Sequence, residues 1–314
     1  MTRYLLRRIG FLVLTVLLTS ILIFIMTRML PGDVARVILG REAGEEALQN
    51  LRQELSLNDP APIQYLQWLI KFAAGDWGNS YSTKSEIRPL VTERLRNSLM
   101  LALLTLMVAV PLAVGLGVLS GLNENKASDQ LISIGSLSMV GLPEFVTGLV
   151  LSQIFAFRLK IFPANSSIRP GASFLEALPM LVLPAMTATL VLLAYIARMI
   201  RAGVIEELKQ PYVRTADLKG MPRHTVIIKH VLRNSLLPTI TIIAISFGWL
   251  ISGLIVIENV FNYPGLGRLL LFAIDRRDLP LIQALAMVTV LGFTLANLAA
   301  DLLYAFLNPR IRLS

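Results

Sequence analysis

Residues Glu206–Pro238 read EELKQPYVRTADLKGMPRHTVIIKHVLRNSLLP, a basic segment that separates two long apolar stretches. The stretch before it, Ala177–Ala197, contains no charged residue, and neither does the stretch after it, Asn234–Ile257. Both come close to the roughly 20 residues that an α-helix needs to cross a bilayer. Loops between transmembrane helices are usually short, so a polar junction of this length suggests more than a connection.

The junction is divided by two residues that typically end and begin helices. Gly220 stands where a glycine C-cap would end one helix, and Pro222 suits the first turn of the next. We therefore expect one short helix over residues 212–219 and another over residues 222–235. The first contains two small side chains that would let its backbone approach a partner closely, Thr215 and Ala216. We interpret the junction as a docking element.

Further apolar runs extend this pattern over the whole chain. A mean hydropathy of +0.67, with 55% hydrophobic residues, excludes an ordinary soluble domain of this size. The first run is too long for a signal peptide, and no small-x-small cleavage site precedes Pro31. The sequence thus predicts an all-α, polytopic membrane protein with six transmembrane helices and both termini on the same side. The six runs are Ile9–Thr27, Ser98–Asn123, Leu131–Phe157, Ala177–Ala197, Asn234–Ile257 and Leu279–Ala300.

The distribution of basic residues predicts the orientation. The two termini, Asn123–Gln130 and Arg198–Arg233 together hold 14 Lys and Arg against 5 Asp and Glu. The opposite side is nearly balanced, with 15 basic and 13 acidic residues. By the positive-inside rule, the first group lies in the cytoplasm. The basic character of the chain is therefore a property of one membrane face and does not indicate nucleic-acid binding.

The runs also predict a domain organisation. Residues 1–30 would form the cytoplasmic N-terminus and the first span, residues 31–97 an insertion domain on the outer side, and residues 98–314 the core with a coupling segment at 201–235. Helical apolar spacing appears within the insertion at Glu45–Leu55 and Ile63–Phe72. Its amphipathic aromatic residues would lie on the headgroup layer. These are Tyr65, Trp68, Trp77 and Tyr81.

Residues for catalysis or cofactor binding are missing from the sequence. There is no GxxxxGK[ST] motif for a nucleotide, and His224 and His230 are too far out of phase on a helix to chelate one metal. We therefore expect no enzyme activity, no catalytic or metal-binding residue and no cofactor. The candidates for a translocation pathway are Pro143, which should kink its span, and Glu144, the only ionisable residue deep in a span. A stand-alone secondary transporter, the alternative class, would commonly carry more such residues.

The segment Tyr212–Gly220, YVRTADLKG, resembles the coupling motif of ATP-binding-cassette importer permeases, in the form YVRTA-x-x-KG of their peptide/nickel branch. The general motif has Glu-Ala-Ala where Arg214, Thr215 and Ala216 stand, and its final Leu-Pro falls on Leu232 and Arg233. The resemblance covers essentially the whole chain. It includes Pro31-Gly32-Asp33, Gly75-Asp76-Trp77-Gly78, Glu258-Asn259-Val260-Phe261, Pro264–Leu270, Arg277-Asp278-x-Pro280, Asp301–Tyr304 and Asn308–Arg312.

The resemblance implies half of the translocation pathway of an importer for di- or oligopeptides in the bacterial plasma (inner) membrane. Its implied partners are a paralogous second permease, two cytoplasmic ATP-binding subunits that bind the ATP, an extracytoplasmic solute-binding protein and the lipid bilayer. Import of nickel, another metal complex or glutathione by the same architecture is the alternative. Coupling to the ATPases would depend on Tyr212, Arg214, Thr215, Ala216, Asp217, Lys219 and Gly220.

Overall fold

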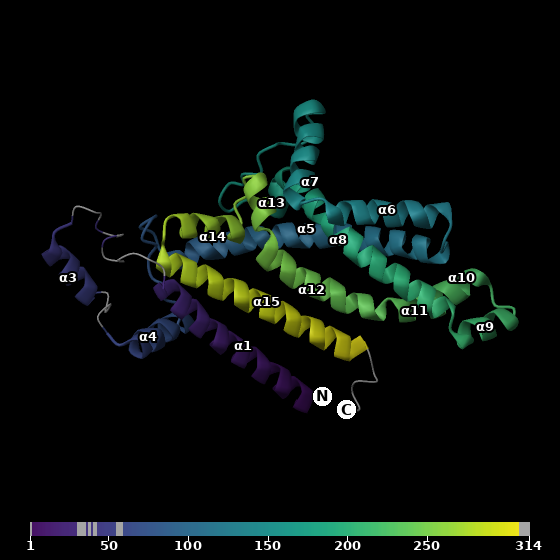
Figure 1. Cartoon of the computed structure of the whole chain (residues 1–314), viewed down its shortest axis with the longest axis horizontal. Helices are drawn as coiled ribbons and strands as arrows, with labels where there is room; N and C mark the ends of the chain where they lie inside the picture. Colours follow the sequence, from purple (N-terminus) through teal and green to yellow (C-terminus); the bar gives the residue numbers. More distant parts are fainter. Residues whose placement is uncertain (1, 30–35, 37–38, 40–42, 55–58, 308–314) are drawn as a thin grey trace.

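The computed structural model describes residues 2–29, 36, 39, 43–54 and 59–307, and the described parts are helices joined by loops (Figure 1). Two of the motifs noted above, Pro31–Asp33 and Asn308–Arg312, lie outside the described residues. In chain order the helices are α1 (Thr2–Met29), α3 (Glu45–Glu54), α4 (Ala61–Ala73), α5 (Ile87–Leu122), α6 (Ala127–Gly141), α7 (Glu144–Leu151), the π-helix η1 (Ser152–Arg158), α8 (Phe174–Leu208), α9 (Pro211–Leu218), α10 (Arg223–Val226), the π-helix η2 (Ile227–Val231), α11 (Leu232–Ser235), α12 (Leu237–Gly253), α13 (Ile255–Val260), α14 (Leu266–Asp275) and α15 (Leu279–Leu307).

Among the described residues, four helices are long and apolar enough to cross a membrane unbroken: α1, α5, α8 and α15. Two further spans are bent pairs, one made by α6 with α7 and η1, the other by α10–α11 with α12. With each bent pair counted as one span, the described residues form six candidate spans. The prediction of an all-α, six-span membrane protein is therefore confirmed.

The centre of the bundle is the contact between α5 and α8. Glycines at positions 117 and 121 of α5 form a small-xxx-small pattern, which lets two helix backbones approach closely. A Cβ atom at Gly117 would lie 2.7 Å from the Ala197 carbonyl oxygen, and one at Gly121 would lie 2.8 Å from the Cβ atom of Val204. These contacts hold the C-terminal part of α5 close against the C-terminal part of α8.

The third span is broken where the sequence predicts a kink. The α6 helix ends at Gly141, Pro143 has an extended backbone, and α7 begins at Glu144. The two halves meet at 105°, so α7 and η1 project from the bundle (Figure 1). The predicted kink at Pro143 is confirmed, and the bend is large enough to interrupt the helix.

At the opposite end of the bundle from α9, the chain is held together by two buried carboxylates. Glu258 accepts hydrogen bonds from Ser98 Oγ at 2.7 Å and from the backbone N–H of Arg268 at 3.0 Å, which joins α13 and α14 to α5. Asp278 accepts hydrogen bonds from Ser80 Oγ at 2.5 Å and from the backbone N–H of Ser82 at 2.9 Å. These contacts seat the loop before α5 on the start of α15.

Helix α5 extends further than its apolar run. It begins at Ile87, so the predicted boundary between residues 97 and 98 lies inside a continuous helix. The first turns carry charged residues on exposed faces, but Ile87 and Val91 are fully buried against α14 and α15. Packing of these two side chains therefore extends the helix beyond the region that hydrophobicity alone marks.

Candidate functional site

Helix α9 carries the predicted coupling residues and ends as the sequence predicts. Gly220 has φ +73°, the left-handed conformation that glycine adopts without strain. The N–H of Met221 bonds to the carbonyl oxygen of Ala216 at 3.2 Å, and that of Gly220 bonds to Asp217 at 2.9 Å. This pair of bonds is a Schellman C-cap. The predicted second helix, residues 222–235, is divided in the structure among α10, η2 and α11.

The two faces of α9 differ in exposure. Val213 and Ala216 are buried at 5% and 8% exposure and pack on the main hydrophobic core, so the small side chain of Ala216 faces this chain's own bundle. On the other face, Leu218 is 81% exposed, the most exposed large apolar side chain among the described residues. Leu218 was not among the predicted coupling residues; those that are exposed are Arg214, Thr215, Asp217, Lys219 and Gly220.

Tyr212 fixes the orientation of α9. Its hydroxyl donates a hydrogen bond to the Glu207 carboxylate at the end of α8 and accepts one from Asn234 Nδ2 of α11 at 3.1 Å. Burial raises the pKa of Tyr212, and the hydrogen bond to Glu207 raises it further. The hydroxyl therefore stays protonated at neutral pH and can keep donating. A single side chain thus links α9 to the helices before and after it.

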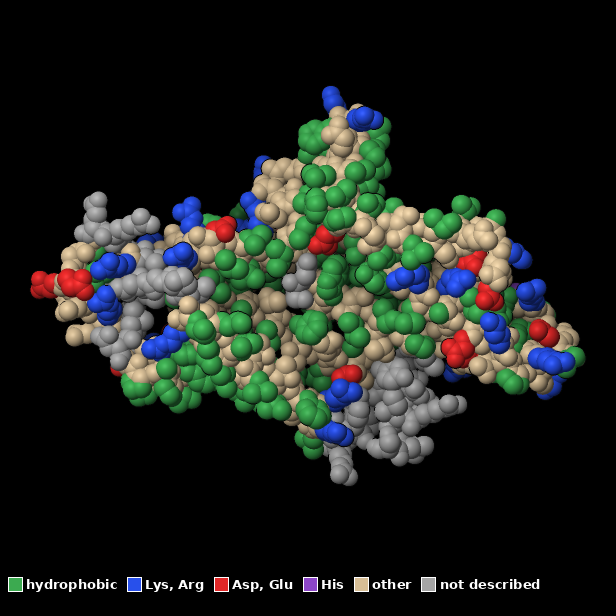
Figure 2. Space-filling model, viewed as in Figure 1, with side chains coloured by type: hydrophobic (Ala, Val, Ile, Leu, Met, Phe, Trp, Pro, Cys, Tyr) green, Lys and Arg blue, Asp and Glu red, His purple; other side chains and the backbone are tan. Residues whose placement is uncertain are grey.

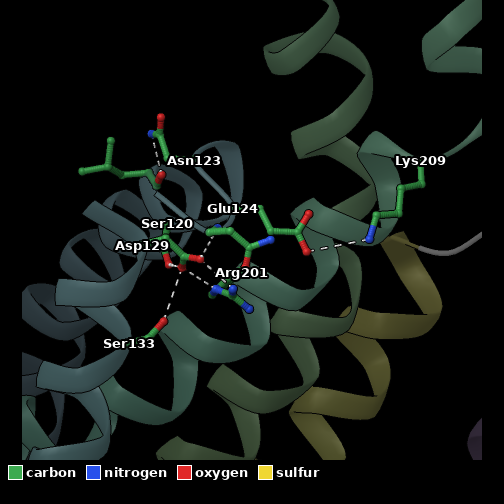
Figure 3. Close-up of polar contacts among 9 residues, drawn as sticks. Ser120, Asn123, Glu124, Asp129, Ser133, Arg201 and Lys209 are labelled. Carbon is green, nitrogen blue, oxygen red and sulfur yellow. Dashed lines mark hydrogen bonds and ion pairs between the residues drawn. The ribbon is translucent and has the colours of Figure 1, made fainter. Parts of the chain in front are cut away.

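Helix α8 connects this site to the rest of the bundle through an ion pair (Figure 3). The guanidinium group of Arg201 on α8 binds the carboxylate of Asp129 on α6 in a bidentate manner, with Nε at 2.6 Å and the second nitrogen at 2.7 Å. Ser120 Oγ of α5 donates to the same carboxylate at 2.5 Å, and the backbone N–H of Asn125 donates at 2.9 Å. The side chain of Asp129 is only 4% exposed.

This cluster joins three helices two turns before the end of α8. It was not predicted, because the sequence places Asp129 in a short polar turn where an acidic residue normally lies in solvent. Nearby, Lys209 and Glu124 form a looser pair at 3.8 Å (Figure 3), in which both side chains are exposed. The Asp129–Arg201 pair thus differs from the Glu124–Lys209 pair in how its residues are packed, and the sequence alone does not reveal that packing.

The two candidate pathway residues lie at the other end of α6. Glu144 occupies the first turn of α7, directly after the break at Pro143, and is half-buried. Among the described residues its carboxylate forms no ion pair with a basic side chain. The structure does not bring Pro143 and Glu144 into contact with α9. It connects the two places through α6, which runs from the Asp129 cluster to the break.

The described residues contain no group of three or more His, Asp or Glu side chains that could hold a metal ion. His230 lies beside Tyr212, with ring centroids 6.4 Å apart, and His224 is exposed on α10. Within the described part of the chain, neither histidine belongs to a group of side chains that could bind a metal ion.

If the chain lines a pathway as the importer permeases that its sequence resembles do, Glu144 is expected to favour positively charged substrates. Its position at a helix break leaves the carboxylate half-buried, where a screened charge contact is worth about 1 kcal/mol, or roughly a fivefold effect. We expect Glu144→Gln to lower uptake of a lysine-containing peptide about fivefold relative to a neutral peptide of equal length, with unchanged affinity of the binding protein. Uptake by reconstituted importer measures this, and Glu176→Gln, at an exposed helix cap, is the control. Equal losses for both peptides would contradict the prediction.

The sequence is similar to known membrane transport proteins along almost its whole length. The sequence matches the family model described as "Binding-protein-dependent transport system inner membrane component" over residues 113–313, and the model for the N-terminal part of such components over residues 1–102. The chain is 36% identical over 313 residues to the "Probable peptide ABC transporter permease protein y4tP" of Sinorhizobium fredii, covering 98% of this chain and 99% of that protein.

A second relative carries a different substrate in its name. The "Glutathione transport system permease protein GsiC" of Escherichia coli strain K12 is 34% identical over 312 residues, which cover 99% of both chains. Among solved structures, the crystal structure of an amino acid ABC transporter with histidines superimposes with a TM-score of 0.51 over 71% of this chain and 94% of that one, at 16% identity. This last similarity concerns the fold alone.

Proposed function

Because this chain belongs to the family of binding-protein-dependent transport system inner membrane components, we propose that it forms half of the translocation pathway of an ATP-driven importer for di- or oligopeptides. The proposed assembly contains a paralogous second permease, two cytoplasmic ATP-binding subunits and an extracytoplasmic solute-binding protein. In this assembly ATP binds to the partner subunits and not to this chain.

The exposed face of α9 is the observation that carries the coupling role. It presents Leu218, an 81% exposed apolar side chain, between charged neighbours at the end of the bundle where α8 stops. Tyr212 holds α9 to α8 and α11, so a displacement of α9 moves both helices. The Arg201–Asp129 pair passes the movement of α8 to α6 and so to the break beside Glu144. Such rigid-body motion can switch a pathway between two faces of a membrane.

The substrate is tested by uptake into proteoliposomes that contain both permeases, the ATPases and the binding protein. We propose peptides because of the peptide permease relative, and glutathione is the second candidate because of the glutathione permease relative. Competition among labelled dipeptide, tripeptide, glutathione and nickel would separate these substrates. Uptake without ATP hydrolysis would instead indicate a secondary transporter.

The proposed orientation places both termini and α9 in the cytoplasm of a bacterial cell with the protein in its inner membrane. A cysteine at Arg223 on α10 should therefore resist a membrane-impermeant thiol reagent in intact cells, while a cysteine at Asn79 should react. Both positions are exposed, and Asn79 avoids the strain that Gly78 would cause at φ +72°. The chain has no native cysteine, so labelling reports only the introduced thiol. The reverse pattern would overturn the orientation.

A further inference from the structure

Helix α4 packs against the transmembrane helix α1 through an aromatic face. Tyr65 and Trp68 lie 5.6 Å and 6.2 Å from Phe24 of α1, measured between ring centroids. Trp68 continues to Phe72, whose ring stacks on Trp77 at 5.2 Å. The sequence suggested that these aromatic residues lie on lipid headgroups. In the structure, Tyr65 and Trp68 pack against α1, so the aromatic face of α4 is covered by protein.

The contact lies below the end of the span. Tyr65 shares a hydrogen bond of 2.8 Å with Ser20, a fully buried residue within the apolar span Leu6–Met29. At 1.5 Å per residue, Ser20 lies roughly 13 Å and Phe24 roughly 8 Å from the end of α1 at Met29. Amphipathic helices that lie in a membrane interface are buried by about 5–10 Å. Along the axis of α1, the Phe24 contact of α4 lies within this range and the Ser20 contact lies slightly deeper.

The free face of α4 is aliphatic. Ile63, Leu66 and Ile70 follow helical spacing and are 46%, 55% and 67% exposed. Beside them runs a polar edge that includes Gln67 and Lys71. Such an arrangement, with a long basic side chain at the border of an apolar face, is typical of helices at a lipid–water boundary.

The aliphatic face continues onto α1. Only 6% of the most apolar window of α1 is buried in this chain, and the exposed side chains in the same turns as Ser20 and Phe24 include Ile21 and Ile25. Figure 2 shows apolar side chains gathered in one area over α4 and α1, at the lower left of the view. At the end of α1 the two helices are also joined by a hydrogen bond of 3.2 Å from the Arg28 guanidinium group to Gln64, a polar contact suited to the headgroup level. The apolar surface itself begins on the transmembrane helix α1 and continues onto α4, so the same lipid environment best matches both parts.

We propose that α4 is embedded in the membrane leaflet that holds the C-terminal end of α1, with Ile63, Leu66 and Ile70 against lipid acyl chains and its polar edge at the headgroups. The segment between α1 and α5 is thereby anchored in the bilayer as well as on the protein. This inference does not depend on which substrate the importer carries.

The test uses single cysteines at Leu66 and at Gln67, labelled with a small fluorophore in the fully assembled importer in phospholipid vesicles. Gln67 is the matched control, because it neighbours Leu66 on the same helix and is also exposed. We expect Leu66 to be quenched several-fold more by phosphatidylcholine with a nitroxide near the ester end of its acyl chain than by aqueous iodide. Gln67 should show the opposite preference. Ile70, which is 67% exposed, gives an independent reading if the Leu66 variant assembles poorly.

Two results would overturn the proposal. Iodide quenching at Leu66 equal to that at Gln67 would mean that the aliphatic face lies in water. Protection of Leu66 from both quenchers would mean that protein, such as the second permease, covers the face in place of lipid. A repeat with the chain alone in vesicles identifies that case, since lipid quenching would then appear only without the partner.

Discussion

Replacement of Leu218 by aspartate is expected to uncouple ATP hydrolysis from transport while leaving the permease folded. The side chain is 81% exposed and makes no contribution to the core, so the change should not destabilise the chain. In a docked complex, however, the few side chains that dominate an interface contribute about 2 kcal/mol or more each, and the high exposure of Leu218 at the end of the bundle makes it the candidate for such a role on α9. Burial of a carboxylate in its place adds a desolvation cost. We expect association with the ATPases to weaken by roughly 30-fold or more.

Co-purification of the ATPase subunits and ATP hydrolysis stimulated by loaded binding protein measure this effect. Leu218→Met is the matched control, because it keeps an apolar side chain of similar volume and should retain both activities. By contrast, Ala216→Trp would test something else, since Ala216 is buried in the chain's own core. Normal stimulation of hydrolysis in Leu218→Asp would show that the exposed face of α9 does not contact the ATPases.

The local features of α9 could be predicted because they depend on neighbouring residues. The positions of Gly220 and Pro222 are sufficient to set where α9 ends and where α10 begins, and these observed bounds differ from the predicted ones by about one residue. The division of the second predicted helix among α10, η2 and α11 was not predicted. The side of α9 that faces the bundle could not be predicted. That side depends on how α8 and α11 approach it, and Ala216 is compatible with either a partner's groove or the chain's own core.

The membrane spans also combine features that the local sequence predicts with features that depend on distant contacts. Apolar runs of sufficient length, of which one is interrupted by Glu144, predict six spans, because the bilayer imposes a minimum length on each helix by itself. The 105° bend after α6 and the extension of α5 to Ile87 depend on contacts with other helices. The burial of Asp129 likewise follows from the position of Arg201, which is 72 residues away in the sequence.

Removal of the Asp129 carboxylate is expected to destabilise the protein. Breaking a fully buried ion pair by truncating one partner typically costs about 3–5 kcal/mol, and the partial exposure of Arg201, which lets water solvate the remaining charge, reduces the expected cost to roughly 1–3 kcal/mol. In Asp129→Ala, the guanidinium group of Arg201, whose side chain is only 30% exposed, would lose both of its bonds to the carboxylate, and Ser120 would lose its acceptor. The midpoint of thermal unfolding of the purified permease in detergent should fall accordingly.

The neighbouring Lys209–Glu124 pair provides a matched control at the same junction. Its side chains are 69% and 40% exposed, and pairs of this kind contribute about 0–1 kcal/mol, so Glu124→Ala should unfold at nearly the temperature of the unchanged protein. The double replacement of Asp129 and Arg201 by leucine should recover much of the loss, because it leaves no unpaired charge in the bundle. If Asp129→Ala unfolds like Glu124→Ala, the cluster does not join α5, α6 and α8. Movement of α9 would then have to reach the break at Pro143 by another route.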